Sequence, residues 1–361
     1  MEDPDWVMGV AERKRDHVRI VLENQSVQRG SNWLDHVHII HRAVTDIDID
    51  AIDTSAYFLG RRFSAPILIE GMTGGTEEAA RINATLAEAA ERAQIPMGVG
   101  SQRAGVQRPE LQYTFRAARE AGPQVFLIAN IGAAQLVQHG TQLAWQAVKM
   151  IEADAIAVHL NTLQEIIQPE GDRGFKGFLA QLKKLCGEIG VPVIVKEVGC
   201  GVSYEDAVVL RDAGVAAIDV AGRGGTSWVE IERLRAIEAG RTDRARLAEV
   251  FQEWGIPTAA SVLEVKQVDG LQVVGSGGIR NGLEIAKLLV LGADIAGLAQ
   301  PFLKASVQGL EEVLTLIGQL TEEVKVAAAL AGVSRTSELR GAPHVLTGPL
   351  LEWTKQRIKK R

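Results

Sequence analysis

The chain has 361 residues, of which 46% are hydrophobic and 23% are charged, and its formal net charge is −6. These values are typical of a globular protein, and the acidic balance argues against a nucleic-acid or membrane-surface partner. No apolar run is long enough to predict a membrane span, and the acidic N-terminus lacks a signal-peptide pattern. Because two cysteines, Cys186 and Cys200, are too few for a disulfide framework, we expect a cytoplasmic protein.

The first 65 residues precede the regular part of the chain. Residues 13–24 (RKRDHVRIVLEN) predict a helix that carries a cationic cluster from Arg13 to His17. Taken alone, this cluster is typical of a solvated helix face, and only a link to a functional site would give it another meaning. Residues 47–63 predict a small β-hairpin.

Eight short apolar runs, rich in β-branched residues, follow from residue 66 onward. Their apolar residues are continuous rather than alternating, as in parallel strands that are buried on both faces. Between the runs, residues 77–94 and 282–292 predict amphipathic helices. The predicted strands occupy residues 66–72, 96–101, 125–132, 155–161, 191–199, 216–222, 271–278 and 294–301.

The spacing of these runs predicts the architecture. Successive strands mostly start 23 to 36 residues apart, which suits one β-loop-α unit each, and the 55-residue gap between Ala216 and Leu271 must hold an insertion. Eight regular units predict a (β/α)8 TIM barrel in the α/β class, with a doubly wound open sheet as the structural alternative. We expect a single domain, with residues 1–65 as an N-terminal extension whose hairpin closes the barrel bottom, 66–310 as the barrel, and 311–361 as C-terminal helices with a solvated basic tail.

Polar or glycine-rich residues follow nearly every predicted strand. Because function in such barrels lies at the C-terminal strand ends, these residues are candidates for a site. The glycine-rich segments 222–227 and 275–282 follow strands six and seven; the second fits phosphate binding by backbone N–H groups, although a tight turn would also use these glycines. Further candidates at strand ends are Met72, Thr73, Gly74, Ser101, Arg103, Asn130, Ala299 and Gln300.

Two residues near the end of strand five are candidate reactive groups. Lys196 lies in an apolar strand, where a lysine is costly unless it meets an anion. It fits a Schiff-base nucleophile, a counter-charge to a cofactor, or a salt-bridge partner of a neighbouring strand, and the sequence does not choose among them. Cys200 is a weaker candidate for a loop nucleophile because no base lies nearby in the sequence.

A polar group follows strand four. His159 and Asn161 alternate along the strand, so both side chains point towards the barrel axis. Gln164 and Glu165 come next in the loop. An inward histidine and asparagine beside a carboxylate suit a diphosphate site in which Glu165 holds Mg²⁺, whereas the alternative is a surface loop with routine polar residues.

Read together, these segments resemble one family, the type 2, FMN-dependent isopentenyl diphosphate isomerases. The resemblance covers nearly the whole chain in the family's order, and its most specific part is HLN-x-x-QE (159–165) followed by PEGD (169–172). The other matching segments are ERKRDH (12–17), GMTGG (71–75), GSQRA (100–104), ANIGA (129–133), VPVIVKEVGCG (191–201), GRGGTSW (222–228) and GSGGIRNG (275–282).

The resemblance implies a role for each candidate residue. It implies catalytic roles for Gln164, Glu165 and Lys196, with Glu165 as the metal ligand. Many members carry a serine where this chain has Ala221, so one hydroxyl contact to FMN is missing or replaced. The implied FMN contacts are Met72, Thr73, Gly74, Ser101, Asn130, Lys196, Thr226, Gly277, Gly278, Ile279, Ala299 and Gln300, and the implied substrate contacts are Arg13, Lys14, Arg103, His159, Asn161 and Gln164.

The family's activity is the interconversion of isopentenyl and dimethylallyl diphosphate without net redox change. The resemblance implies reduced FMN, NADPH as the reductant and Mg²⁺, with proton transfer near flavin N5, and a homo-tetramer or homo-octamer. An electron-rich flavin face suits a reaction that passes through a cationic hydrocarbon.

Two rival functions remain. An FMN-dependent 2-hydroxy-acid oxidase or dehydrogenase would share the barrel, the strand-end lysine and the phosphate site, but the segment AGRGGTSW (221–228) lacks the histidine base of that family. A non-catalytic binder of phosphorylated ligands would not need Gln164, Glu165 and Lys196 together.

Overall fold

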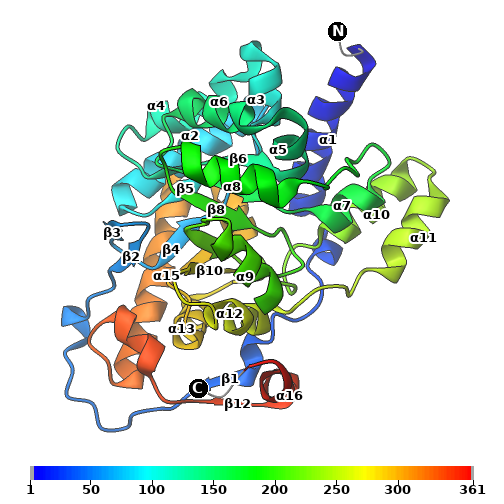
Figure 1. The fold of residues 1–361 in the computed structure, drawn as a ribbon. Helices are drawn as coiled ribbons and strands as arrows, with labels where there is room; N and C mark the ends of the chain where they lie inside the picture. Colours follow the sequence, from blue (N-terminus) through cyan, green and yellow to red (C-terminus); the bar gives the residue numbers. More distant parts are fainter. Residues whose placement is uncertain (1–3, 359–361) are drawn as a thin grey trace.

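The computed structural model describes residues 4–358, and their side chains from Lys14 onward. Eight parallel strands form a closed barrel surrounded by helices (Figure 1), which confirms the predicted (β/α)8 architecture and excludes the open sheet. The barrel closes where β11 pairs in parallel with β4. Its strands are β4 (Ile67–Ile69), β5 (Met97–Gly98), β6 (Leu127–Gly132), β7 (Ala155–His159), β8 (Val193–Lys196), β9 (Ala217–Asp219), β10 (Gln272–Ser276) and β11 (Ile295–Leu298).

The helices around the barrel begin where local sequence favours it. Thr76 caps α2 by accepting the backbone N–H of Ala79, and Asn281 caps α13 in the same way from Glu284. Both helices lie where the sequence predicts them. The covering helices are α2 (Glu77–Ala93), α3 (Arg103–Gln107), α4 (Tyr113–Ala121), α5 (Ala133–His139), α6 (Thr141–Ile151), α7 (Thr162–Ile167), α8 (Phe178–Glu188), α9 (Tyr204–Asp212), α12 (Thr258–Lys266), α13 (Gly282–Leu291) and α14 (Gln300–Gln308).

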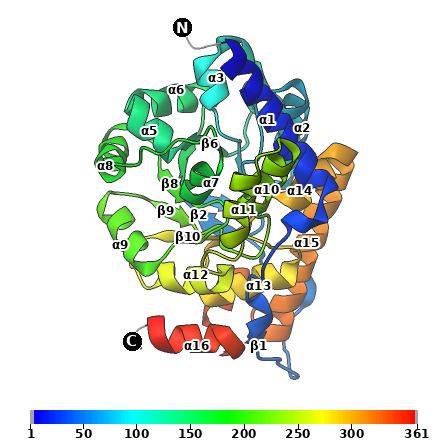
Figure 2. The same cartoon turned by 90° about the vertical axis from the view of Figure 1, so that its right-hand side faces the viewer.

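The insertion after the sixth barrel strand is helical. It contains α10 (Trp228–Glu238) and α11 (Thr242–Val250), which lie before the barrel helix α12. The N-terminal helix α1 (Pro4–Glu23) packs against α10 and α14 (Figure 2). It begins before residue 13, where the cationic pattern in the sequence starts. Helices α1 and α10 lie over part of the end of the barrel at which its strands terminate (Figure 2).

A short hairpin closes the barrel bottom, as predicted, but it is smaller than residues 47–63. Its strands are β2 (Ala56–Phe58) and β3 (Arg61–Phe63), preceded by a 3₁₀ turn at Ile49–Ala51. Phe58 and Phe63 pack into one apolar cluster with inward-pointing strand residues such as Leu68 and Ile128. Burial of these rings seals the end of the barrel opposite the predicted site.

The C-terminal segment is not entirely helical, contrary to the prediction. Helix α15 (Leu310–Ala331) is followed by β12 (His344–Leu346) and then α16 (Gly348–Arg357). Strand β12 pairs antiparallel with β1 (Val37–Ile39), so the C-terminal segment lies beside the stretch of chain that follows α1, below the barrel (Figure 1). A strand of three residues is too short to leave a periodic signal in the sequence. Within the described residues, no helix combines the length and apolarity needed to span a bilayer.

Candidate active site

A large cleft lies at the C-terminal ends of the barrel strands and encloses about 1820 Å³, including solvent at its mouth. This is the position at which (β/α)8 barrels carry their active sites. The structure brings seventeen of the predicted residues to the walls of this cleft: Lys14, Met72, Thr73, Ser101, Arg103, Asn130, His159, Asn161, Gln164, Glu165, Lys196, Thr226, Gly277, Gly278, Ile279, Ala299 and Gln300.

Two predicted residues are not among the side chains that line the cleft. A Cβ added at Gly74 would overlap the ring of Phe115, so this glycine allows close packing behind the wall. The side chain of Arg13 lies outside the described residues.

Helix α1 forms part of the cleft. The ammonium of Lys14 donates to the carbonyl of Ser101 at 3.2 Å and lies 5.3 Å from the centre of the Phe115 ring. Further along, Gln28 donates to the Thr226 hydroxyl at 2.7 Å. Arg15, between the inward residues of the cationic cluster, is exposed. The cluster therefore has one face on the cleft and one face on solvent.

A buried carboxylate of α10 joins α1 to α7, the short helix that carries Gln164 and Glu165, which the sequence predicted to lie in a loop. Glu232 Oε1 lies 3.0 Å from His17 Nε2 and accepts the amide of Gln164 at 3.1 Å, while Oε2 pairs with Arg235 at 2.6 Å. Burial disfavours its charge, but His17, Arg235 and Gln164 outweigh burial and lower the pKa of Glu232 to about 2. Gln164 is therefore held by a carboxylate that stays ionised.

Glu232 could not be predicted from the sequence, because it lies in the insertion, away from any strand end. His17 belongs to the motif ERKRDH (12–17), but the motif alone indicates no role for it. Helix α10 carries the glutamates Glu230, Glu232 and Glu238, and nothing in the sequence separates the two buried ones from the exposed Glu238.

The predicted metal ligand is fixed by the loop that follows it. Glu165 Oε1 accepts from Asn161 at 2.8 Å, and Oε2 accepts the backbone N–H of Asp172 at 2.7 Å. A Cβ at Gly171 would overlap the backbone of Glu165, so the PEGD turn needs glycine at this close approach. The side chain of Asp172 then pairs with Arg103 at 3.1 Å. This network links the predicted metal ligand to a predicted substrate residue.

The side chains around Glu165 indicate what kind of metal site this part of the cleft could form. Among the described residues no cluster of three or more histidine, cysteine or acidic side chains could hold an ion. One carboxylate beside cationic residues instead suits Mg²⁺ that is shared with substrate phosphates and water, which is how proteins often hold this ion.

His159 is neutral in the free protein. Its Nδ1 lies 2.8 Å from Asn130 Oδ1, and Asn130 donates its amide to the Val99 carbonyl at 3.0 Å. Because Asn130 uses its amide as a donor there, Nδ1 of His159 carries the proton in this contact. Burial, followed by the positive charges of Lys196 and Lys14, lowers the pKa of His159 to about 4.

Lys196 pairs with two carboxylates. Its Nζ lies 2.7 Å from Asp219 Oδ2 and 3.0 Å from Glu70 Oε2. Burial opposes the charge of Lys196, but Asp219 and Glu70 outweigh it and raise its pKa above the usual value. Of the three alternatives for this lysine, the structure shows the salt bridge, in a position that also faces the cleft. An ammonium held in this way is a poor Schiff-base nucleophile.

A serine hydroxyl lies beside Ala221. The backbone N–H of Ala221 donates to Ser276 Oγ at 3.1 Å, and Ser276 also contacts Asp219 Oδ1. Ser276 lines the cleft. The Ser276 hydroxyl therefore lies next to Ala221, the position at which many family members carry a serine.

The two glycine-rich loops pack against each other at the cleft. Gly277 and Gly278 have φ values of 105° and 78°, in the left-handed region that favours glycine. A Cβ at Gly225 would overlap the backbone of Gly278. The glycines therefore serve both as tight turns and as close walls of the cleft.

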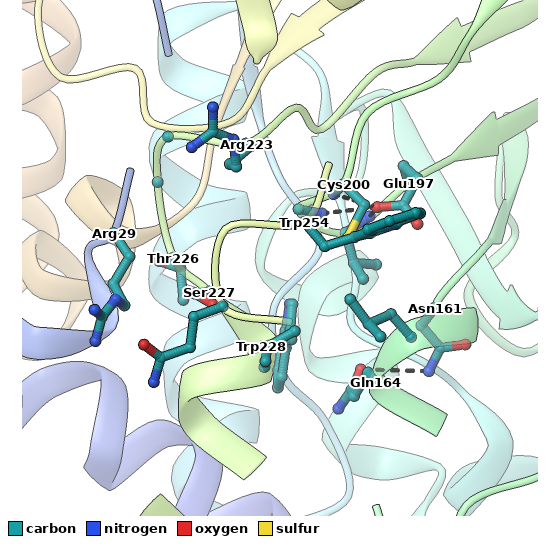
Figure 3. Close-up of a pocket in the computed structure, with 17 residues that line it drawn as sticks. Arg29, Asn161, Gln164, Glu197, Cys200, Arg223, Thr226, Ser227, Trp228 and Trp254 are labelled. Atoms are coloured by element: carbon teal, nitrogen blue, oxygen red, sulfur yellow. Dashed lines mark hydrogen bonds between the residues drawn. The ribbon is translucent and has the colours of Figure 1, made fainter. Parts of the chain in front are cut away.

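A smaller pocket adjoins the cleft (Figure 3). Trp254 lies over Glu197 and Cys200 there, with Trp228 and Gln164 nearby. Burial, and then the charge of Glu197, raise the pKa of Cys200 to about 12, so its thiol stays protonated. This argues against the loop-nucleophile hypothesis, because the thiolate is the reactive form.

A family model and similar solved structures define the class of protein to which this chain belongs. A family model described as FMN-dependent dehydrogenase matches residues 114–346, which is more than half of the chain. A solved mandelate oxidase variant with 2-hydroxy-phenylacetamide has a TM-score of 0.62 and 19% identity, and covers 94% of this chain and 98% of its own. Mandelate oxidase with benzoyl-formic acid has a TM-score of 0.60, 19% identity, and coverage of 93% and 98%. The family match makes this an FMN-dependent barrel enzyme, and the solved structures share its fold.

More similar relatives narrow the class. The isopentenyl-diphosphate delta-isomerase of Ignicoccus hospitalis is 46% identical over 353 residues, which cover 97% of either chain. That of Methanosarcina barkeri is 43% identical and covers 97% of this chain and 96% of its own. The chain belongs to the family of isopentenyl-diphosphate delta-isomerases. The resemblance inferred from the sequence is thereby confirmed.

Proposed function

We propose that this protein interconverts isopentenyl diphosphate and dimethylallyl diphosphate with reduced FMN and Mg²⁺. The observation that carries the proposal is that the residues expected to hold a diphosphate and those expected to hold a flavin line one and the same cleft. The net reaction adds a proton at one carbon of the allylic unit and removes another two carbons away, so no electrons are exchanged overall.

The proposed diphosphate site lies on the side of the cleft formed by α1 and by the loops after β5 and β7. Lys14 and Arg103 supply positive charge, and Asn161 supplies an amide. His159, neutral when the site is free, gains a second N–H donor if it takes up a proton beside the anionic substrate. Glu165 would hold Mg²⁺ against the diphosphate oxygens.

The proposed flavin site lies across the ends of β4, β5, β6, β8, β9, β10 and β11. When bound in reduced form, FMN supplies an electron-rich ring that stabilises positive charge on the hydrocarbon. The backbones of Gly277 to Ile279, Ala299 and Gln300 would bind its phosphate, and Thr73, Ser101, Asn130 and Thr226 would bind its polar edges. Lys196 would supply the positive charge that the reduced ring needs.

Gln164 is the proposed side chain nearest the reacting carbons. Its amide donates to Glu232, and its oxygen accepts from Asn161 at 3.3 Å. These two contacts fix the direction of the amide, so Gln164 can orient the alkenyl group and exclude water. We further propose NADPH as the reductant of FMN, a cytoplasmic location, and a homo-tetramer or homo-octamer.

One assay tests this function. The protein is incubated without oxygen with FMN, NADPH, Mg²⁺ and isopentenyl diphosphate, and the products are identified. We expect dimethylallyl diphosphate in large excess over the NADPH oxidised. Oxidation of a 2-hydroxy acid with no isomerisation would instead support the oxidase alternative, and FMN binding without turnover would support a binder.

The metal proposal predicts a specific defect in Glu165→Gln. Loss of a charged metal contact of about 1.5–3 kcal/mol should raise the Mg²⁺ concentration for half-maximal rate about 10- to 100-fold. Bound FMN should stay at the parent's level. The measurement is a Mg²⁺ titration of the initial rate beside the visible absorbance of the bound flavin.

Glu170→Gln is the matched control, because Glu170 lies in the same loop and pairs with Arg235 at 3.2 Å, away from the proposed metal. It should titrate like the parent. A Glu165→Gln protein that also follows the parent's Mg²⁺ curve would show that the metal is held elsewhere or is not needed.

A further inference from the structure

Glu70 is a buried acid at the floor of the cleft that the proposed mechanism does not use. It directly follows β4, its residue is 5% exposed, and it lines the cleft with Lys196. In the order of strands around the barrel, β4 lies opposite β8, so Glu70 reaches Lys196 across the barrel axis. Asp219 reaches the same lysine from the adjacent strand β9.

The two acids are not equivalent. Asp219 Oδ2 pairs with Lys196, and its Oδ1 contacts the Ser276 hydroxyl and accepts the Ala221 N–H. Glu70 Oε2 has Lys196, but its Oε1 is buried and has no hydrogen-bond partner among the described residues. A single lysine therefore shares its charge between two carboxyl groups, and Glu70 is the one with a buried oxygen that accepts no hydrogen bond from the described residues.

The barrel makes room for this carboxyl group. A Cβ placed on Gly297, in β11, would overlap Glu70 Oε1. Gly297 is not among the glycines with positive φ, so its backbone conformation does not require glycine. Glycine at this position instead leaves space for the carboxyl group of Glu70.

We propose that Glu70 is a positioning residue that controls the charge Lys196 presents to the flavin. When Glu70 carries its proton, Lys196 and Asp219 balance each other, and the ammonium can pair with a reduced, anionic flavin. When Glu70 loses its proton, the group becomes net negative and repels that flavin. The proposal rests on the proposed FMN site and adds a proton that is linked to binding of the reduced cofactor.

The surroundings of Glu70 support this balance. Burial, and then the charge of Asp219, raise the pKa of Glu70 to about 8, although Lys196 opposes the shift. Lys196 and Asp219 are the charged groups that face it. Strands β10 and β11 bring the uncharged Ser276 and Gly297, and His159 beyond Lys196 is neutral because its pKa is lowered to about 4.

The test measures FMN binding in the absence of substrate. Dissociation constants of oxidised FMN and of dithionite-reduced FMN are determined anaerobically between about pH 7 and 9.5, where free reduced FMN is already anionic. One linked proton changes an equilibrium about tenfold per pH unit. We expect the preference of the parent for reduced over oxidised FMN to fall about tenfold per unit above about pH 8.

The decisive variant is Glu70→Gln, which keeps the size of the side chain and removes its titration. Its preference for reduced over oxidised FMN should not change with pH, and at pH 9.5 it should exceed the parent's by about tenfold or more. Glu264→Gln is the matched control, because Glu264 is a buried acid that pairs with Arg357 on α16, outside the cleft. It should follow the parent's curve.

A second variant covers the case in which Glu70→Gln fails to fold. Gly297→Ala leaves every charge in place but displaces the carboxyl group of Glu70, so the pH step should disappear or move by more than about one unit. A pH step in either variant that matches the parent's overturns the proposal. The proposal is also overturned if the parent's preference for reduced over oxidised FMN does not change with pH. Failure of the parent to bind FMN at all would instead contradict the proposed function.

Discussion

Lys196→Ala is expected to lower the affinity for reduced FMN about 10- to 100-fold and turnover at least as much, because a charge-assisted contact contributes about 1.5–3 kcal/mol. From the sequence alone, we expect FMN retention and turnover to suffer far more than folding. The structure predicts a substantial loss of folding stability as well, because removing one partner of a buried ion pair costs about 3–5 kcal/mol. Here the removed ammonium leaves Glu70 and Asp219 facing each other.

The stability loss should depend on pH in a definite direction. The pKa of Glu70 is about 8 in the folded parent, above the usual value of a glutamate, and it rises further without Lys196. Such a group stabilises the fold below its unfolded pKa, and the contribution is lost as pH rises through the folded pKa. The free energy of unfolding of Lys196→Ala should therefore be closest to the parent's near pH 5 and should fall furthest below it above pH 8.

Denaturant unfolding at pH 5, 7 and 8.5 measures this, alongside FMN content. Lys287→Ala is the control, because that lysine donates to the Leu34 carbonyl at 2.9 Å outside the cleft. Equal stability of Lys196→Ala and the parent at pH 8.5 would contradict the ion-pair argument. Trapping of a substrate adduct on Lys196 with borohydride would contradict the counter-charge role.

Removal of residues 1–17 should give a folded, yellow protein that is nearly inactive at low substrate concentration. It removes Arg13 and Lys14, and two phosphate contacts at about 1.5–3 kcal/mol each correspond to a loss of about 10²- to 10⁴-fold in apparent substrate affinity. The barrel, hairpin and glycine-rich loops remain, so FMN should stay bound. The rate at increasing isopentenyl diphosphate concentration, with a thermal melt, measures both effects.

Single substitutions on α1 sharpen this result. Lys14 faces the cleft and Arg15 is exposed on the same helix, so Lys14→Ala should weaken substrate binding about tenfold or more while Arg15→Ala should not. Full activity of the shortened protein at low substrate would mean that the cationic cluster is only a solvated face.

The barrel was predictable because its strands are continuous apolar runs at regular spacing. The same principle located the cleft, since polar residues such as Lys196 and His159 stand at strand ends. Glu70 carried the same signal at the end of the first run, yet its partner could not be inferred. Lys196 and Glu70 lie on opposite strands, and only closure of the barrel brings them together. Glu232 and the strands β1 and β12 had no comparable signal.

The pairing of β1 with β12 has a consequence for the order in which the protein is completed. Val37 pairs with Leu346, so these partners are separated by almost the whole length of the chain. During synthesis the barrel units emerge one after another, and each can pack on its predecessor, but β1 has no partner until residue 346 has left the ribosome. The pairing of β1 with β12 beneath the barrel can therefore form only after the last barrel strand, β11, has been made, whereas α1 can pack against α10 and α14 before β12 exists.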